Sequence, residues 1–160
     1  MPRLGNRTRF LKQSEIRNMT LECTRAGGIN LSQGVCDTPV PKIVADAARA
    51  AIEEGHNTYT RYDGFPELRE AIARRLSQHN QLDVTGDGDV VVTSGSSAAF
   101  YGACLGILDP GDEVVLFEPF YGYHLDTLRA LGAEARLVSL RAPDWSFSVE
   151  ELRAAIGPHT

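Results

Sequence analysis

Two short segments of the chain carry residue types that could bind a ligand. The first, Ser94-Gly95-Ser96-Ser97, follows the β-branched run at residues 89–93 and precedes an apolar stretch. If the run is a strand and the stretch a helix, serine hydroxyls, free backbone N–H groups and the positive helix end lie together. That arrangement can bind a phosphate group. A simple helix cap by Ser94 or Ser96 explains the same residues equally well, and no GxGxxG or GxxxxGK[ST] motif is present.

The second segment, residues 118–124, is rich in aromatic side chains. Phe120, Tyr121 and Tyr123 stand beside Pro119, and His124 ends the segment. Such residues can form a stacking wall for a flat ligand, although packing in the core or at its rim is an alternative for each aromatic. His124 is open to both a structural and a catalytic interpretation.

Few other residues offer chemistry. The two lysines are Lys12, near the N-terminus, and Lys42, at the start of a predicted helix, and neither follows a predicted strand of the main sheet. Neither is therefore expected to form a Schiff base there. Asp63 and Asp126 are the acids nearest to the two segments, and we expect both to be turn or surface residues. The three cysteines are widely spaced, so no disulfide framework or metal site is predicted.

The hydrophobic pattern predicts an α/β protein. From residue 89 onward strands and helices alternate, which predicts a doubly wound, mainly parallel sheet. The pattern ends where a fourth strand is due, so we expect the sheet to be incomplete. The expected strands are residues 29–31, 89–93, 113–117 and 135–140, the expected helices 14–26, 41–54, 66–76, 98–108, 121–131 and 148–156, and the expected turns 86–88 and 109–112.

Composition narrows the function classes. A formal charge of -5 over 160 residues gives nucleic acids and anionic membranes no long-range attraction, and no apolar run is long enough to span a bilayer. The N-terminal residues contain no secretory signal pattern. We therefore expect a cytoplasmic protein that binds neither nucleic acid nor membrane.

Four segments together resemble the class I/II aminotransferases, fold-type I enzymes that depend on pyridoxal 5′-phosphate. Their order and spacing match the family over nearly the whole chain. The matching segments are residues 29–34 (INLSQG), 59–69 (YTRYDGFPELR), 93–98 (TSGSSA), and 110–114 (PGDEV) with 118–121 (EPFY).

The resemblance implies a role for six residues. Ser96 and Ser97 would bind the cofactor phosphate, and Tyr121 would stack on the pyridine ring. Tyr59 would reach the phosphate of the neighbouring subunit's cofactor, which implies a homodimer with shared sites. Gly34 would lie beside the substrate carboxylate. His124 would lie near the aspartate that pairs with the pyridinium nitrogen. The substrates implied are an amino acid and a 2-oxo acid.

The resemblance also implies what the chain does not contain. The family's Schiff-base lysine, pyridinium-pairing aspartate and carboxylate-binding arginine would all lie beyond residue 160. No catalytic residue is therefore expected within residues 1–160. We expect residues 1–40 to be an N-terminal arm and small-domain segment and residues 41–160 the first part of the cofactor-binding large domain, as a fragment. Alternatives within the fold are a C–S lyase or a cyclopropane-carboxylate synthase, and outside it a non-catalytic remnant.

Overall fold

The computed structural model describes residues 3–160; Met1 and Pro2, the start of the expected arm, lie outside the described residues. The chain forms two compact units. One combines the described residues up to Gln33 with Gly95–Thr160, and the other is Gly34–Ser94. Within the described residues, no helix has both the length and the apolar character needed to cross a membrane.

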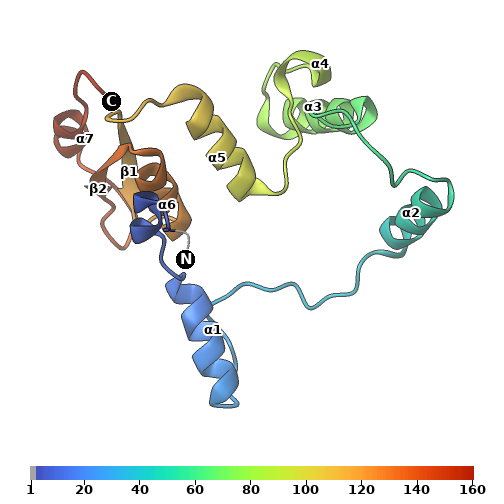
Figure 1. The fold of residues 1–160 in the computed structure, drawn as a ribbon, viewed down its shortest axis with the longest axis horizontal. Coiled ribbons are helices and arrows are strands. Elements are labelled where there is room, and N and C mark those ends of the chain that lie inside the picture. The colour runs from blue at the N-terminus through green and yellow to red at the C-terminus, as the bar shows by residue number, and fades with distance from the viewer. Residues whose placement is uncertain (1–2) are drawn as a thin grey trace. The chain divides into compact units, whose positions relative to one another are not determined.

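The helices follow the sequence pattern closely (Figure 1). In the first unit a short 3-10 helix, η1 (Asn6–Phe10), precedes α1 (Glu15–Arg25), and later come α5 (Ser96–Ile107), α6 (Gly122–Leu131) and α7 (Val149–Ala155). The second unit contains α2 (Lys42–Glu53), α3 (Pro66–Asn80) and α4 (Gly86–Asp89). Gly132 ends α6 with a φ of 84°, a left-handed conformation that glycine adopts without steric cost.

A parallel pair of strands lies at the centre of the first unit. β1 (Glu113–Glu118) pairs with β2 (Glu134–Ser139) in the register Glu113↔Glu134 to Glu118↔Ser139. The predicted turn before β1 forms as expected: the Asp112 N–H donates to the Asp109 carbonyl over 3.1 Å, and Gly111 has a φ of 99°. The strands predicted at 113–117 and 135–140 are therefore confirmed, with α6 as the crossover between them.

The hydrophobic core of the first unit lies between helices α5 and α6 and strands β1 and β2. Leu128 of α6 is completely buried, and Cys104 of α5 and Ala133 are buried beside it. Cys104 is thus the small buried hydrophobe that its apolar surroundings predict, and burial raises the pKa of its thiol. Partly buried hydrophobic residues from α5, α6, β1 and β2 complete the cluster: Phe100, Leu108, Val114, Leu116, Leu131 and Ala135.

The prediction of a strand at residues 89–93 is wrong. Val90 is extended, but its carbonyl accepts from the Arg69 side chain, and the Val92 N–H donates to the Asp63 carbonyl over 2.9 Å. A strand needs a neighbouring strand for its ladder, and within residues 3–160 the sheet consists of β1 and β2. The segment is also not buried on both faces, because Val91 is 64% exposed.

Two smaller expectations are also wrong. Residues 29–31 form no strand, and Ile29 and Leu31 are exposed. Residues 86–88, expected as a turn, belong to α4, where the Thr85 hydroxyl accepts from the Gly88 N–H. A Cβ at Gly86 would lie 2.7 Å from the backbone nitrogen of Glu70, so glycine lets α4 approach α3.

Ser148 and Glu151, three residues apart at the start of α7, have the spacing of a capping box, but only half of the box forms. The Ser148 hydroxyl accepts from the Glu151 N–H over 3.2 Å. The Glu151 carboxylate bonds to the Arg141 guanidinium instead of returning to the backbone of the cap. An ion pair with a neighbouring segment has replaced the second bond of the box.

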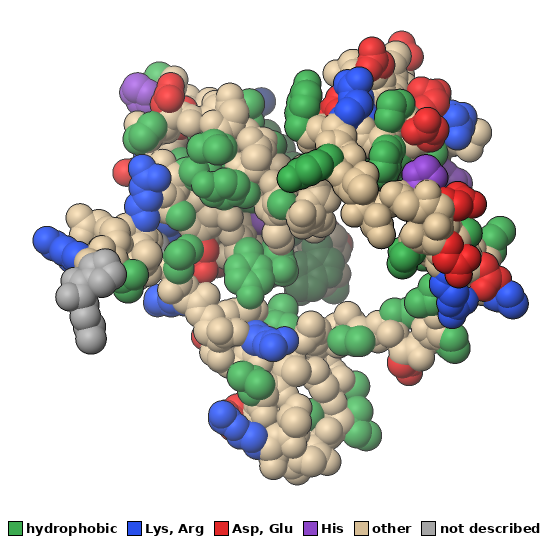
Figure 2. All heavy atoms as spheres, turned by 45° about the vertical axis from the view of Figure 1, so that its right-hand side comes forward, with side chains coloured by type: hydrophobic (Ala, Val, Ile, Leu, Met, Phe, Trp, Pro, Cys, Tyr) green, Lys and Arg blue, Asp and Glu red, His purple; other side chains and the backbone are tan. Residues whose placement is uncertain are grey.

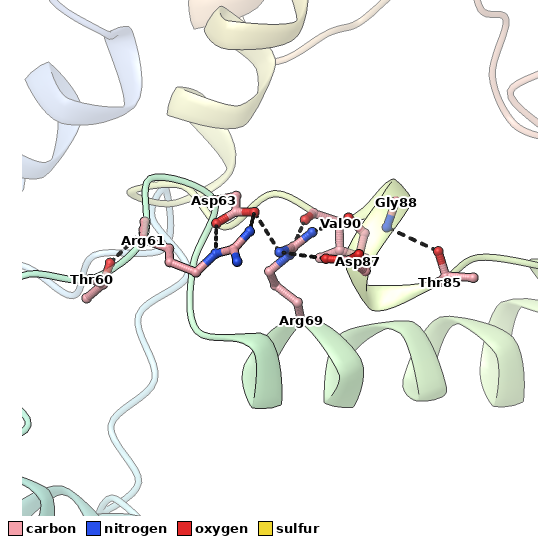
Figure 3. A network of polar contacts seen from close by, with 8 residues as sticks. All are labelled: Thr60, Arg61, Asp63, Arg69, Thr85, Asp87, Gly88 and Val90. Atoms are coloured by element: carbon pink, nitrogen blue, oxygen red, sulfur yellow. Dashed lines mark hydrogen bonds and ion pairs between the residues drawn. The ribbon is translucent and has the colours of Figure 1, made fainter.

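A buried ion pair in the second unit joins the loop before α3 to α3 itself (Figure 3). Asp63 and Arg69 are 4% and 3% exposed, and Arg69 Nη1 lies 2.6 Å from Asp63 Oδ2. Asp63 lies in a turn, as one half of the expectation had it, but its side chain is buried, so it is not a surface residue. Two guanidinium groups, from Arg61 and Arg69, replace the water that the carboxylate loses on burial.

Truncating the centre of the core should destabilise the first unit strongly. We expect Leu128→Ala to lower the free energy of unfolding by about 2–5 kcal/mol, the usual cost of a cavity left by a buried leucine. Leu105→Ala, on the other core-packing helix, α5, but at a side chain that is 59% exposed, should cost far less. Urea unfolding followed by circular dichroism measures both, and equal losses would contradict this assignment of the core.

Protonation of Asp63 should destabilise the second unit. The Arg61 guanidinium holds the pKa of this carboxyl below its ordinary value of 3.8, with a further contribution from Arg69. A carboxyl whose pKa is lower in the folded chain adds stability that is present above its ordinary pKa and lost as the pH falls through the folded-state value. We expect the urea midpoint to fall below about pH 4, and to fall less in Asp63→Asn. If the urea midpoints of wild type and Asp63→Asn fell in parallel with pH, the ionised Asp63 carboxylate would not be the source of the stability.

Candidate functional site

The segment 94–97 turns the chain into the start of α5. Gly95 is the N-cap residue, with φ 81° and ψ 173°, a backbone conformation that residues with side chains rarely adopt. The N-cap residue is thus Gly95, which has no side chain to cap the helix, so the interpretation of Ser94 or Ser96 as the capping residue is wrong. Ser96 and Ser97 are exposed, and the first turn carries no acidic residue. Two hydroxyls and the N–H groups of the first turn can therefore bind an anion.

The aromatic residues of the second segment gather at the start of α6. Tyr121 is the N-cap residue, and the His124 N–H donates to its carbonyl over 2.9 Å. The Tyr121 ring meets the rings of Tyr123 and His124 edge-on, with centroids 5.2 Å and 5.4 Å apart. Tyr121 is 47% exposed, so part of its ring remains available to a flat ligand.

Helices α5 and α6 bring the two segments into one region. The His124 ring stacks on the Phe100 ring of α5, with centroids 4.1 Å apart and planes inclined by 29°. Phe100 lies four residues after Ser96 and three after Ser97, so the three share one face of α5 within about one turn. Four of the six expected site residues, Ser96, Ser97, Tyr121 and His124, therefore lie close together in the first unit.

A hollow of about 400 Å³ lies against the start of α6. Tyr121, Tyr123 and Arg129 line it from α6, and Lys12 lines it from the segment between η1 and α1. The sequence placed Lys12 in the N-terminal arm without connecting it to the aromatic segment. Packing of η1 against α6 makes that connection, and only the folded chain shows it. The other lysine, Lys42, is ion-paired to Asp46 on α2.

The remaining two expected site residues, Tyr59 and Gly34, belong to the second unit. Tyr59 lies in the loop before α3, and its side chain is fully exposed, at 103% of the reference value. A Cβ added at Gly34 would meet no atom of the described chain within 4 Å, so packing in this chain does not demand glycine there. The roles of both residues stay predictions.

Arg69 joins the loop that carries Tyr59 to α3 through Asp63, a contact not expected from the sequence. Arg69 stands on the helical stripe four residues before the buried Ala73, where an apolar residue would be expected. A charged residue on an apolar stripe was the available signal, because a buried guanidinium needs an anionic partner. The sequence did not show that the partner is Asp63.

The chain matches the family model for "Aminotransferase class I and II" over residues 26–160. It is 37% identical over 145 residues to a probable N-succinyldiaminopimelate aminotransferase, DapC, of Mycobacterium tuberculosis, covering 89% of this chain and 36% of that protein. It is 33% identical to an aspartate/prephenate aminotransferase of Thermus thermophilus, covering 98% of this chain and 42% of that protein. The chain thus spans about two fifths of the length of these relatives.

Solved structures agree with these relationships. The N-succinyldiaminopimelate aminotransferase of Mycobacterium tuberculosis superimposes with a TM-score of 0.89 at 34% identity, over 99% of this chain and 42% of that one. Aspartate aminotransferase from Thermus thermophilus with maleate gives a TM-score of 0.90 at 32% identity, over 100% of this chain and 43% of that one. These findings confirm the expected α/β fold class, with the parallel pair β1–β2 as part of the fold-type I sheet. The chain belongs to the class I and II aminotransferase family.

Proposed function

We propose that this chain supplies the phosphate- and ring-binding part of an aminotransferase that uses pyridoxal 5′-phosphate and moves an amino group from an amino acid to a 2-oxo acid. The observation that carries the proposal is the serine-rich first turn of α5, which is close to the aromatic start of α6 through the stacked rings of Phe100 and His124. The residues fit the cofactor chemically: Ser96 and Ser97 offer hydroxyl donors at a positive helix end, with no acidic side chain in the first turn to repel a phosphate.

The chain's own residues would bind and orient. Ser96, Ser97 and the N–H groups of the first turn of α5 would hold the phosphate, and Tyr121 would keep the pyridine ring flat. His124, stacked on Phe100, would lie near the aspartate that pairs with the pyridinium nitrogen of the cofactor. Gly34 would leave room for the substrate carboxylate. When bound, the cofactor supplies an electron sink for the charge that develops at the substrate's α-carbon.

Two copies of the chain would share their sites, with Tyr59 of each copy donating to the phosphate bound by the other. The full exposure of Tyr59 supports this arrangement. Large hydrophobic side chains also remain at the surface of the described chain (Figure 2), among them Ile43, Val91 and Ile107. Apolar surface of this kind is typical of an interface between subunits. The division at residues 40 and 41 and the cytoplasmic location stay predictions, the latter supported by three free cysteines.

Amino-group transfer is the preferred reaction, because the relatives described above are named as aminotransferases of N-succinyldiaminopimelate, aspartate and prephenate. We expect the whole aminotransferase to which this chain contributes to transfer ¹⁵N from a labelled amino acid to the amino acid formed from an added 2-oxo acid, as measured by mass spectrometry. Release of ammonia together with a thiol would identify a C–S lyase instead, and ring closure with loss of a leaving group a synthase.

The phosphate site can be tested by binding alone. We expect Ser96→Ala and Ser97→Ala each to raise the Kd for pyridoxal 5′-phosphate about tenfold, because each removes a hydrogen bond to a charged group. Affinity for pyridoxal, which lacks the phosphate, should not change. Absorbance titrations measure the binding of both ligands, and phosphorus NMR follows the phosphate of pyridoxal 5′-phosphate. Ser77→Ala, at an exposed serine of α3, is the matched control. Equal losses for the two ligands would rule out a phosphate contact.

A further inference from the structure

The carboxylate of Asp63 is shared by two guanidinium groups at the base of the Tyr59 loop (Figure 3). Arg61 binds it through two bonds, from Nε to Oδ1 over 3.0 Å and from Nη2 to Oδ2 over 2.9 Å. Arg69, a residue of α3, donates from Nη1 to Asp63 Oδ2 over 2.6 Å. We call Arg61, Asp63 and Arg69 the loop cluster. It joins a residue two positions after Tyr59 to a buried residue of a stable helix.

The loop cluster also fixes the backbone around it. Arg69 Nε donates to the Val90 carbonyl over 2.8 Å, and the Asp63 carbonyl accepts from the Val92 N–H over 2.9 Å. The Gly64 N–H donates to the Arg61 carbonyl over 3.1 Å, which closes a turn. A Cβ at Gly64 would lie 2.6 Å from a methyl carbon of Val92, so the turn is packed tightly against the extended segment.

Tyr59, just before the loop cluster, has a fully exposed aromatic side chain. The Tyr59 side chain contributes nothing to the core of the unit, since it is fully exposed, and Thr60 beside it donates from its hydroxyl to the Arg61 carbonyl over 2.7 Å. A donor held on a fixed turn loses less conformational entropy on binding than one on a mobile loop. The cost of burying Asp63 and Arg69 is therefore explained if the turn must present Tyr59 in one position.

We propose that Asp63 is a positioning residue: held by Arg61 and Arg69, it fixes the turn that presents the Tyr59 hydroxyl to a phosphate group bound by a second copy of this chain. The inference rests on the proposed function, which supplies the phosphate. A cluster that merely stabilised its unit would affect ligand binding independently of Tyr59. A positioning cluster acts only through Tyr59, and this difference can be measured.

The experiment is a double-mutant cycle on the full chain with pyridoxal 5′-phosphate as the ligand. We expect Tyr59→Phe to raise the Kd about tenfold, the loss of one hydrogen bond to a charged group. Asp63→Asn should raise it by a similar factor, and the double variant should bind no more weakly than Tyr59→Phe alone. A double variant about a hundredfold weaker than wild type, the product of two independent losses, would overturn the positioning role.

Controls separate folding from positioning. Asp46→Asn removes an aspartate that is also paired with two cations, Lys42 and Arg49, but is exposed on α2, and it should bind as wild type does. If Asp63→Asn does not fold by circular dichroism, Arg61→Gln replaces it in the cycle, because it leaves the Asp63–Arg69 pair intact. We expect Arg61→Gln to raise the Kd about threefold, within the range for an exposed ion pair, and to have no effect in a Tyr59→Phe background. An effect that persists there would overturn the proposal.

The outcomes also distinguish this inference from the proposed function. No saturable binding by wild type, or none that depends on Ser97, would contradict the proposed function itself. Dependence on Ser97 and Tyr59 without dependence on Asp63 would contradict the positioning role alone. Dependence on Ser97 without dependence on Tyr59 would remove the shared phosphate contact, and the positioning role with it.

Discussion

Burial of Leu128 between two helices and two strands is the interaction on which the ligand-binding region depends. Leu128 of α6 contacts the core that Cys104 supplies from α5, and β1 and β2 close the same cluster. Because this core aligns α5 with α6, the rings of Phe100 and His124 stack one turn from the start of α5. Hydrophobic packing thereby places polar donors from α5 next to an aromatic surface from α6, although neither group contributes to the core itself.

The two units handle charge in different ways: the first offers backbone N–H groups to an anion, and the second pairs charged side chains with one another. The chain carries a net charge of -5, yet the start of α5 is a local site for an anion, because its N–H groups and dipole act within a few ångströms. In the second unit, buried charge is compensated side chain to side chain, through Asp63, Arg61 and Arg69. Such a cluster adds little net stability but penalises any arrangement that leaves one partner unpaired, so it favours a single conformation of the turn.

Local sequence signals predicted the longer helices and the turn at residues 109–112 well, because helix ends and turns are decided by neighbouring residues. Gly132 ends α6, and Gly111 permits the turn before β1, as expected. The strand predicted at residues 89–93 failed for the opposite reason. Val90 does adopt an extended backbone, but a strand exists only where a second strand pairs with it, and the partners of this segment are a side chain and a loop.

For the candidate site, the sequence by itself determined the donor set and the family: two serines after a glycine, an aromatic segment one strand later, and four motifs in order. The tertiary structure decided which of these residues meet. It brought Ser96 and Ser97 near Tyr121 and His124 through the packing of α5 on α6, and it brought Lys12 to a hollow that Tyr121 also lines. It also buried Asp63, whose partner Arg69 lies six residues away on α3. Residue types follow from the sequence, whereas proximity and burial depend on contacts between distant segments, which only the folded chain forms.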